Sequence, residues 1–288
     1  MLSLLVLEEM RKIKPFYQII SCFFFAILGV QIKKLLLIDN IENLVFYRSF
    51  FGMLLLLITI LLTQKRVFFL INTGNIKIHI FRCLCGVSAM YFGYQSLMFL
   101  TLAQASTIGF TKVFFTCLIS FFIFSEKLNL KVIFLIFLGF MGIILITRPG
   151  QIESDTGVYM ALFSAICVSG GIISISYLSK REETLTILFY HSLFSTIIFF
   201  SIFYSKISFK SFDLIGSYFL ITLTALLGQY FNTESYKNFE TKNVVILSYS
   251  RIIFSTIFGF IFFDEKINFM SLVGILIVCL TSFLVQKK

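Results

Sequence analysis

Long apolar runs separated by short polar segments recur along the whole chain. The approximate boundaries of these runs are 16–37, 43–62, 79–99, 103–124, 131–147, 156–177, 184–204, 214–235, 242–263 and 268–286. Each run is close to the roughly 20 residues that a helix needs to cross about 30 Å of hydrocarbon. Since lipid offers the backbone no hydrogen-bond partner, such runs must fold as helices. The pattern therefore predicts an all-α integral membrane protein with ten transmembrane helices.

The overall composition agrees with this class. Hydrophobic residues make up 58% of the 288 residues, charged residues make up 13%, and the mean hydropathy is +0.97. These values lie outside the range of soluble domains. The first ten residues include Glu8 and Glu9 where a signal peptide would have its cleavage region, so we expect no removable targeting segment.

The net charge of +10 resides mostly in the predicted loops. With the N-terminus in the cytoplasm, the inner segments carry 14 of the 24 Lys and Arg residues and the outer segments carry 6. This bias predicts a multi-pass protein of the cell inner membrane with both termini cytoplasmic. Because the basic residues form no continuous patch, we expect no nucleic-acid partner. Four cations fall within predicted spans: Arg48, Arg82, Lys112 and Arg251.

An internal repeat relates the two halves of the chain. An offset of 139 residues places "FSEKLN" (124–129) on "FDEKIN" (263–268) and Lys112 on Arg251. Nearer the front of each half the offset is 143, and Arg48 falls on His191. Two halves of five helices must enter the membrane from opposite sides, which predicts an inverted repeat with domains 1–150 and 151–288. Such a fold places a substrate site near the midplane, between the repeats.

The ten helices, the five-helix repeat and the Glu-Lys pairs at 126–127 and 265–266 resemble the drug/metabolite transporter superfamily, in particular its EamA-type members. The segment 79–107 is similar to the corresponding region of bacterial S-adenosylmethionine uptake carriers. The resemblance implies secondary transport of a small organic solute by alternating access, without ATP hydrolysis. Many relatives have a proline in the fourth and ninth helices, near the positions of Val113 and Ile252. Here Lys112 and Arg251 stand beside these positions without a proline, so the resemblance alone does not predict the kink geometry of these helices or the identity of the substrate.

Lys112 is predicted to lie deep inside a continuous helix over 103–124. A straight helix places it roughly 14 Å from Ala103 and roughly 21 Å from Glu126. An isolated cation at the bilayer centre costs about 2.5–3.5 kcal/mol on insertion scales, so Lys112 must face protein or water. Of the 14 acids, only Glu234 falls clearly within a predicted span.

Three interpretations of Lys112 stay open. The cavity is cationic when empty, and a substrate anion binds Lys112 and Arg251. Alternatively, Lys112 pairs with Glu234 or with helix-end carbonyls as a structural charge. In the third, Lys112 is neutral.

The third and eighth helices concentrate polar and aromatic residues that suit a ligand with a planar or apolar body. Interhelical hydrogen bonding explains the same pattern equally well. The candidate substrate-binding residues on these helices are Tyr91, Tyr94, Gln95, Gln229, Tyr230 and Asn232.

Other charged and small residues receive separate predictions. Glu234, Arg48 and His191 are candidates for coupling or gating, although a histidine or acid here also serves as a packing partner. Arg82 lies three residues inside its predicted span, so we expect it to reach the interface as an anchor. The pairs Gly139 with Gly142 and Gly170 with Gly171 are predicted sites of close helix approach.

The sequence therefore predicts a secondary transporter of an anionic or zwitterionic solute, such as an amino acid or S-adenosylmethionine. The alternatives are a non-transporting scaffold or assembly subunit and, with less support, an integral-membrane enzyme. The enzyme is disfavoured because the predicted spans hold no cluster of His, Asp or Glu and no metal-ligand spacing. We expect no cofactor and no metal. The expected partners are a small-molecule substrate and the lipid bilayer, and the sequence leaves a homodimer open.

Overall fold

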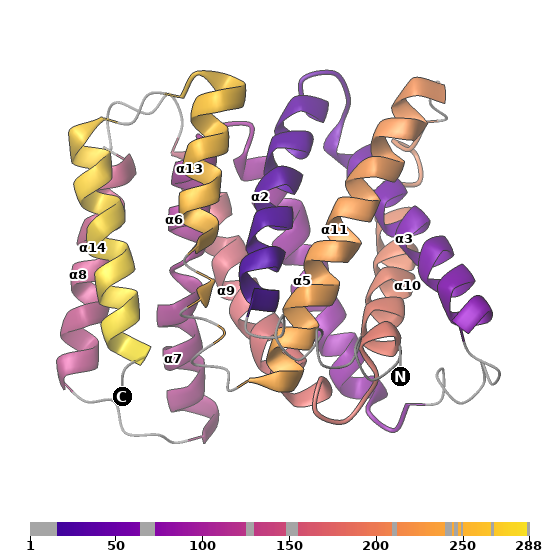
Figure 1. Cartoon of the computed structure of the whole chain (residues 1–288), viewed down its shortest axis with the longest axis horizontal. Coiled ribbons are helices and arrows are strands. Elements are labelled where there is room, and N and C mark those ends of the chain that lie inside the picture. Colours follow the sequence, from indigo (N-terminus) through magenta and orange to yellow (C-terminus); the bar gives the residue numbers. More distant parts are fainter. Residues whose placement is uncertain are drawn as a thin grey trace, which may run out of the picture.

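Helices account for all regular structure in the described part of the chain. The computed structural model describes residues 16–63, 73–124, 130–147, 155–208, 212–239, 244, 247–248, 250–265 and 268–286. Within these ranges the elements, drawn in Figure 1, are α2 (Tyr17–Leu35), α3 (Ile41–Thr63), α5 (Ile76–Ser96), α6 (Leu102–Gly109), α7 (Lys112–Phe124), α8 (Leu130–Thr147), α9 (Thr156–Leu178), α10 (Thr184–Phe203), α11 (Phe212–Asn238), α13 (Ser250–Phe263) and α14 (Phe269–Gln286).

Five of the described helices are long and apolar enough to cross a bilayer by length and composition. They are α2, α3, α9, α10 and α11. The prediction of an all-α membrane protein is confirmed at this level, while the number of ten crossings stays a prediction. The first described helix begins, and the last one ends, at the same end of the molecule (Figure 1).

The closest helix packing joins the first and second halves of the chain. Helix α5 packs along α9, α11 along α2, α10 along α3, and α14 along α8. Figure 1 shows α8 and α14 together at one edge and α3 and α10 at the other. Further contacts join α13 to α2, and α6 and α7 to α9. Every one of these pairs combines a helix before residue 150 with one after it, so the two halves share one interface over most of their helices.

A partly buried ion pair joins the halves at one end of the molecule. The Lys33 ammonium lies 2.6 Å from a Glu265 carboxylate oxygen and donates a hydrogen bond of 3.0 Å to the Leu100 carbonyl. The same carboxylate accepts the backbone N–H of Leu102, at the start of α6. A single acid therefore connects α2, the start of α6 and the segment that follows α13.

A second polar cluster joins the halves at the opposite end. His79 Nε2 lies 2.6 Å from one Glu182 oxygen, and the other oxygen accepts hydrogen bonds from Thr73 and Asn75. Burial by itself raises the pKa of the Glu182 carboxyl, but the hydrogen bonds from Thr73, Asn75 and His79 lower that pKa below its ordinary value. Glu182 is therefore a carboxylate at neutral pH.

The predicted continuous helix over 103–124 is wrong at its centre, because α6 ends at Gly109 and α7 begins at Lys112. The N–H groups of Phe110 and Thr111 donate to carbonyls three residues earlier, which tightens the chain into a 3₁₀-like turn. Gly109 is a weak helix former, and the Thr111 hydroxyl bonds to the Ile108 carbonyl at 2.7 Å, so both residues weaken a regular helix here. Lys112 is thus the first residue of α7, and the distances to Ala103 and Glu126 predicted from one straight helix do not apply to it.

Arg251 occupies a similar place in the second half. Helix α13 begins at Ser250, so Arg251 lies in its first turn. The prediction had placed Arg251 well inside a helix over 242–263. Residues 242–243, 245–246 and 249 of that prediction lie outside the described residues.

Glycines permit close helix approach at some of the predicted positions. A Cβ added to Gly142 would lie 2.9 Å from a Val278 methyl, and one added to Gly170 would lie 2.8 Å from Cys85 Sγ. A Cβ at Gly171 would meet no atom within 4 Å. The prediction for Gly171 is therefore wrong, since the neighbouring helix lies on the Gly170 side of α9.

We predict that Gly170→Ala destabilises the protein and that Gly171→Ala does not. Both changes gain the helix propensity of alanine, about 0.8–1.0 kcal/mol. Only Gly170→Ala also forces α9 away from α5, at a cost of about 1–3 kcal/mol. Thermal unfolding of the two purified variants in detergent measures the difference. Equal melting temperatures would show that the approach of α5 and α9 at Gly170 is not close.

Candidate functional site

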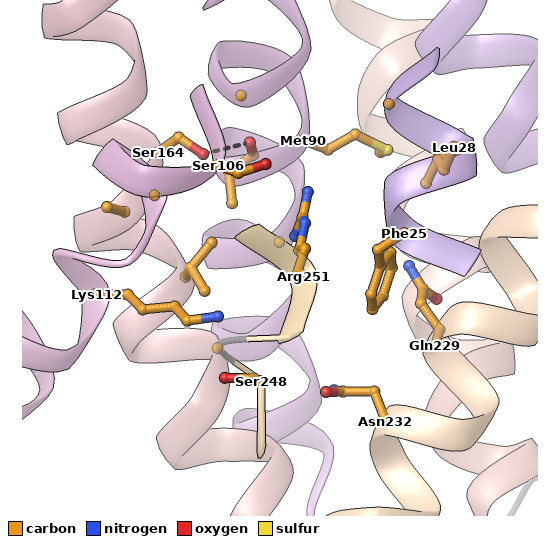
Figure 2. A pocket seen from close by; sticks show the side chains of 18 of the residues that line it. Phe25, Leu28, Met90, Ser106, Lys112, Ser164, Gln229, Asn232, Ser248 and Arg251 are labelled. Atoms are coloured by element: carbon orange, nitrogen blue, oxygen red, sulfur yellow. Dashed lines mark hydrogen bonds between the residues drawn. The ribbon is translucent and has the colours of Figure 1, made fainter. Parts of the chain in front are cut away.

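A cavity of about 290 Å³ lies among the helices. Its walls come from α2, α3, α5, α6, α9, α10, α11 and α13 and from the start of α7. This volume is at the lower end of the roughly 300–1,000 Å³ of small-molecule sites in proteins. Both halves of the chain contribute to the walls, and Figure 2 shows side chains from several helices pointing into the space.

The cavity wall is strongly cationic. All four cations that the sequence places inside spans line it, and His191 is next to them. The cations are Arg48, Arg82, Lys112 and Arg251. Among the described residues that line the cavity, none is Asp or Glu. The fold therefore concentrates positive charge in the cavity, and none of the described lining residues supplies a negative charge to neutralise it.

Among the described residues, Lys112 and Arg251 contact aromatic rings, and no acid lies within ion-pair distance of either. Lys112 Nζ lies 4.5 Å from the centre of the Phe110 ring, and the Arg251 guanidinium carbon lies 5.3 Å from that of Phe25. Such contacts contribute about 0.5–2 kcal/mol and leave the net charge unchanged. Arg251 Nε is buried without a hydrogen-bond partner. In Figure 2 both side chains point into one central space, with Gln229 and Asn232 of α11 across from them.

Arg48 and Arg82 are buried to a similar degree, with 7% and 5% of their surface exposed. The Arg48 guanidinium carbon lies 5.8 Å from the centre of the Tyr94 ring, and its Nη1 contacts the Met90 sulfur at 2.6 Å. Arg82 Nη1 donates a long hydrogen bond of 3.4 Å to the Ile187 carbonyl. The Nε atoms of both arginines are buried without a hydrogen-bond partner.

His191 packs against the backbone of α5. A Cβ added to Gly86 would lie 2.5 Å from the His191 ring, so only glycine leaves room for the ring here. His191 Nδ1 is buried without a hydrogen-bond partner. His191 is also within electrostatic range of Arg48 and Arg82, which makes this part of the wall a cluster of three nitrogen-rich side chains.

Several candidate residues from the sequence meet at this cavity. They are Lys112, Arg251, Tyr94, Gln229, Asn232, Arg48 and His191. The other candidates do not line it. Tyr91 packs its ring on Phe203, at 5.4 Å between ring centres, and Tyr230 packs against Phe231 at 5.7 Å. Gln95 is absent from the wall because it follows Tyr94 directly and points about 100° away around the helix.

Glu234 also lies away from the cavity wall. One of its oxygens accepts a hydrogen bond of 2.5 Å from the Thr184 hydroxyl, and the other accepts one of 3.3 Å from the Asn238 amide. Its described partners are thus neutral groups at the end of the bundle. Neither Lys112 nor Arg82 is among them.

Some residues of the cavity wall are not among those predicted from the sequence. The prediction that Arg82 reaches the interface is wrong, because Arg82 is buried and lines the cavity. Gln18, Cys22 and Phe25 of α2 line it too. Their spacing of three and four residues places them on one helix face, and this is the signal in the sequence that could have identified them.

Comparison with known proteins gives matches over nearly the whole chain. The profile of the EamA-like transporter family matches residues 13–148 and again residues 155–286. The pseudopaline exporter of Pseudomonas aeruginosa is 24% identical over 271 residues, which cover 91% of this chain and 93% of the exporter. Solute carrier family 35 member G1 of Mus musculus is 26% identical over 285 residues, which cover 93% of this chain and 76% of the carrier.

A solved crystal structure has the same fold, with a TM-score of 0.61, 13% identity and coverage of 94% of both chains. The names of these relatives do not mention S-adenosylmethionine, so the similarity to S-adenosylmethionine uptake carriers stays a prediction.

We predict that the cavity attracts anions measurably more than cations. In a background without the six native cysteines, Asn232→Cys provides a single thiol in the wall. We expect an anionic methanethiosulfonate reagent to modify it at least about tenfold faster than a cationic one, because a focused positive potential raises the local anion concentration. Because both reagents react with the same thiolate, the thiolate fraction of the cysteine cancels in the ratio of the two rates.

Ser205→Cys, in the exposed turn after α10, supplies the control ratio. Adding Lys112→Gln or Arg251→Gln to Asn232→Cys is expected to lower the ratio. A ratio at residue 232 equal to or below that at residue 205 would show that the cavity charge is neutralised.

Proposed function

The chain belongs to the EamA-like transporter family, whose relatives transport small molecules across membranes, and from this premise we propose that it carries a small organic anion or zwitterion by alternating access. The substrate binds in the cavity between the halves. Lys112 and Arg251 hold its charged end, and Tyr94, Gln229 and Asn232 contact its body.

The observation that carries this proposal is the cluster of buried cations without acids. A positive charge inside a bilayer is costly unless an opposite charge or water compensates it. The aromatic rings beside Lys112 and Arg251 offset only part of this cost. A bound carboxylate or phosphate satisfies the same groups fully, since charge-assisted hydrogen bonds to anions are short and strong.

The positions of Lys112 and Arg251 in their helices support the same substrate charge. Both lie in the first turn of a helix, α7 and α13. Helix N-termini carry a partial positive charge, and transporters commonly direct such ends of broken helices at anionic substrate groups. The helix ends and the side chains thus favour an anion together.

The reciprocal packing of the two halves supports alternating access. The contact of α5 with α9 corresponds, under exchange of the halves, to that of α11 with α2. Contacts of this kind are expected for an inverted repeat, in which rocking of one half against the other opens the two ends in turn. The Lys33–Glu265 pair and the His79–Glu182 pair lie at the two ends and join opposite halves. In the proposed cycle each pair breaks when its end opens, with the His79–Glu182 end facing the cytoplasm.

Counterflow in proteoliposomes tests this function. Vesicles loaded with one unlabelled solute are mixed with the same solute in labelled form, over a panel of amino acids, S-adenosylmethionine, nucleosides and organic acids. We expect one anionic or zwitterionic solute to exchange. Lys112→Ala and Arg251→Ala are each expected to lower exchange at least about 30-fold, because truncating a buried charge partner costs about 2–5 kcal/mol of affinity.

Arg181→Ala is the matched control, since it removes an exposed cation outside the cavity and is expected to retain exchange. Unfolding temperature and size-exclusion profile of each variant establish that the protein is folded. Undiminished exchange in folded Lys112→Ala and Arg251→Ala protein would place the binding site elsewhere.

A further inference from the structure

The cations of the cavity form two groups on different helices. We call Lys112 and Arg251, from α7 and α13, the first cationic group. Electrostatic interaction links these two side chains. We call Arg48 and Arg82, from α3 and α5, the second cationic group, and both of them interact with His191 of α10. Each group has aromatic support of its own, from Phe25 at Arg251 and from Tyr94 at Arg48.

Within the described part of the chain, no Asp or Glu lies within ion-pair distance of Arg48 or Arg82, and none lines the cavity. The contact of Arg48 Nη1 is with the Met90 sulfur, which is a weak acceptor, and that of Arg82 Nη1 is with a carbonyl at 3.4 Å. Both Nε atoms and His191 Nδ1 are buried without a hydrogen-bond partner. An arginine presents five N–H donors in a planar fork that matches a carboxylate or phosphate. Two such forks with open donors in one wall therefore form a site for a second anion.

Both groups line one cavity of about 290 Å³, so a single solute can reach both of them. Ala89 and Gly93 of α5 and Ala165 of α9 line the same wall. Tyr94 lines the same cavity, with its ring centre 5.8 Å from the Arg48 guanidinium carbon, and it is also within electrostatic range of Arg251. A slender chain that passes the Tyr94 ring can present one anionic group to each end.

We propose that the cavity binds a solute with two separate anionic groups, one held by Lys112 and Arg251 and the other by Arg48 and Arg82. This inference rests on the proposed function and narrows its substrate class to dianions such as dicarboxylates. A solute with a single carboxylate neutralises only one of the two groups.

Binding of matched dicarboxylates and monoamides tests the proposal. Purified wild-type protein in lipid nanodiscs is titrated with succinate, glutarate and adipate and with the monoamide of each acid, in chloride-free buffer. The amide keeps the size and removes one charge. We expect at least one dicarboxylate to bind about tenfold or more tightly than its monoamide, because the second carboxylate adds one charge-assisted contact to the protein. In Arg82→Gln and Arg48→Gln this preference disappears while the monoamide still binds.

The outcomes separate this inference from the proposed function. If monoamides and dicarboxylates bind alike to wild type and Lys112→Ala abolishes both, the second subsite is overturned and the anion carrier stands. If adding chloride makes a monoamide bind as tightly as its dicarboxylate, the second group holds a separate inorganic anion and the proposal is wrong. If neither series binds, the anion site itself and the proposal that rests on it both fail. Arg181→Gln, outside the cavity, is expected to keep the preference of wild type.

Discussion

The burial of four cations with no acid among the described residues around them is the constraint on which the rest of this structure depends. Four basic side chains meet in one cavity, and the described wall around them contains no acid. A hydrocarbon-facing position would be far more costly for any of them, so the helices must enclose them. The aromatic faces of Phe25, Tyr94 and Phe110 compensate part of the charge. The positive charge that these rings leave uncompensated is the reason for proposing an anion as the ligand.

Acids are used elsewhere in the fold, at the ends of the bundle. Glu265 pairs with Lys33, and Glu182 contacts His79, each time between opposite halves of the chain. Among the described residues, the acids at the ends have partners inside the protein, whereas the central cations have no acid beside them. The ends are joined by the Lys33–Glu265 ion pair and the His79–Glu182 hydrogen bond, and the proposed anion binding assigns the uncompensated charge of the centre to a ligand.

Much of the helical architecture was predictable, because apolar runs of membrane length leave little choice of structure. The alignment of Lys112 with Arg251 also placed two residues of the cavity wall correctly. The break at Gly109–Thr111 was not predictable, since the usual proline is missing and the turn depends on a threonine hydroxyl. The position of Arg82 was predicted wrongly, because the distance of a residue from the helix end gives its depth in the membrane but not the direction in which its side chain points. Tyr91 and Gln95 show the same limit, since one or three residues along a helix decide which side chain reaches the cavity.

Glu265 has a further consequence for the proposed opening of its end of the molecule. The turn before it contains Asp264 with a φ of 51°, a left-handed conformation that Asp tolerates better than most residues. The Glu265 carboxylate lies over Gly259, where an added Cβ would clash with one of the carboxylate oxygens. The same carboxylate holds the Lys33 ammonium and the first N–H of α6. Withdrawing this one side chain thus releases an ion pair and a helix cap together, which makes the end cooperative, either fully joined or fully parted.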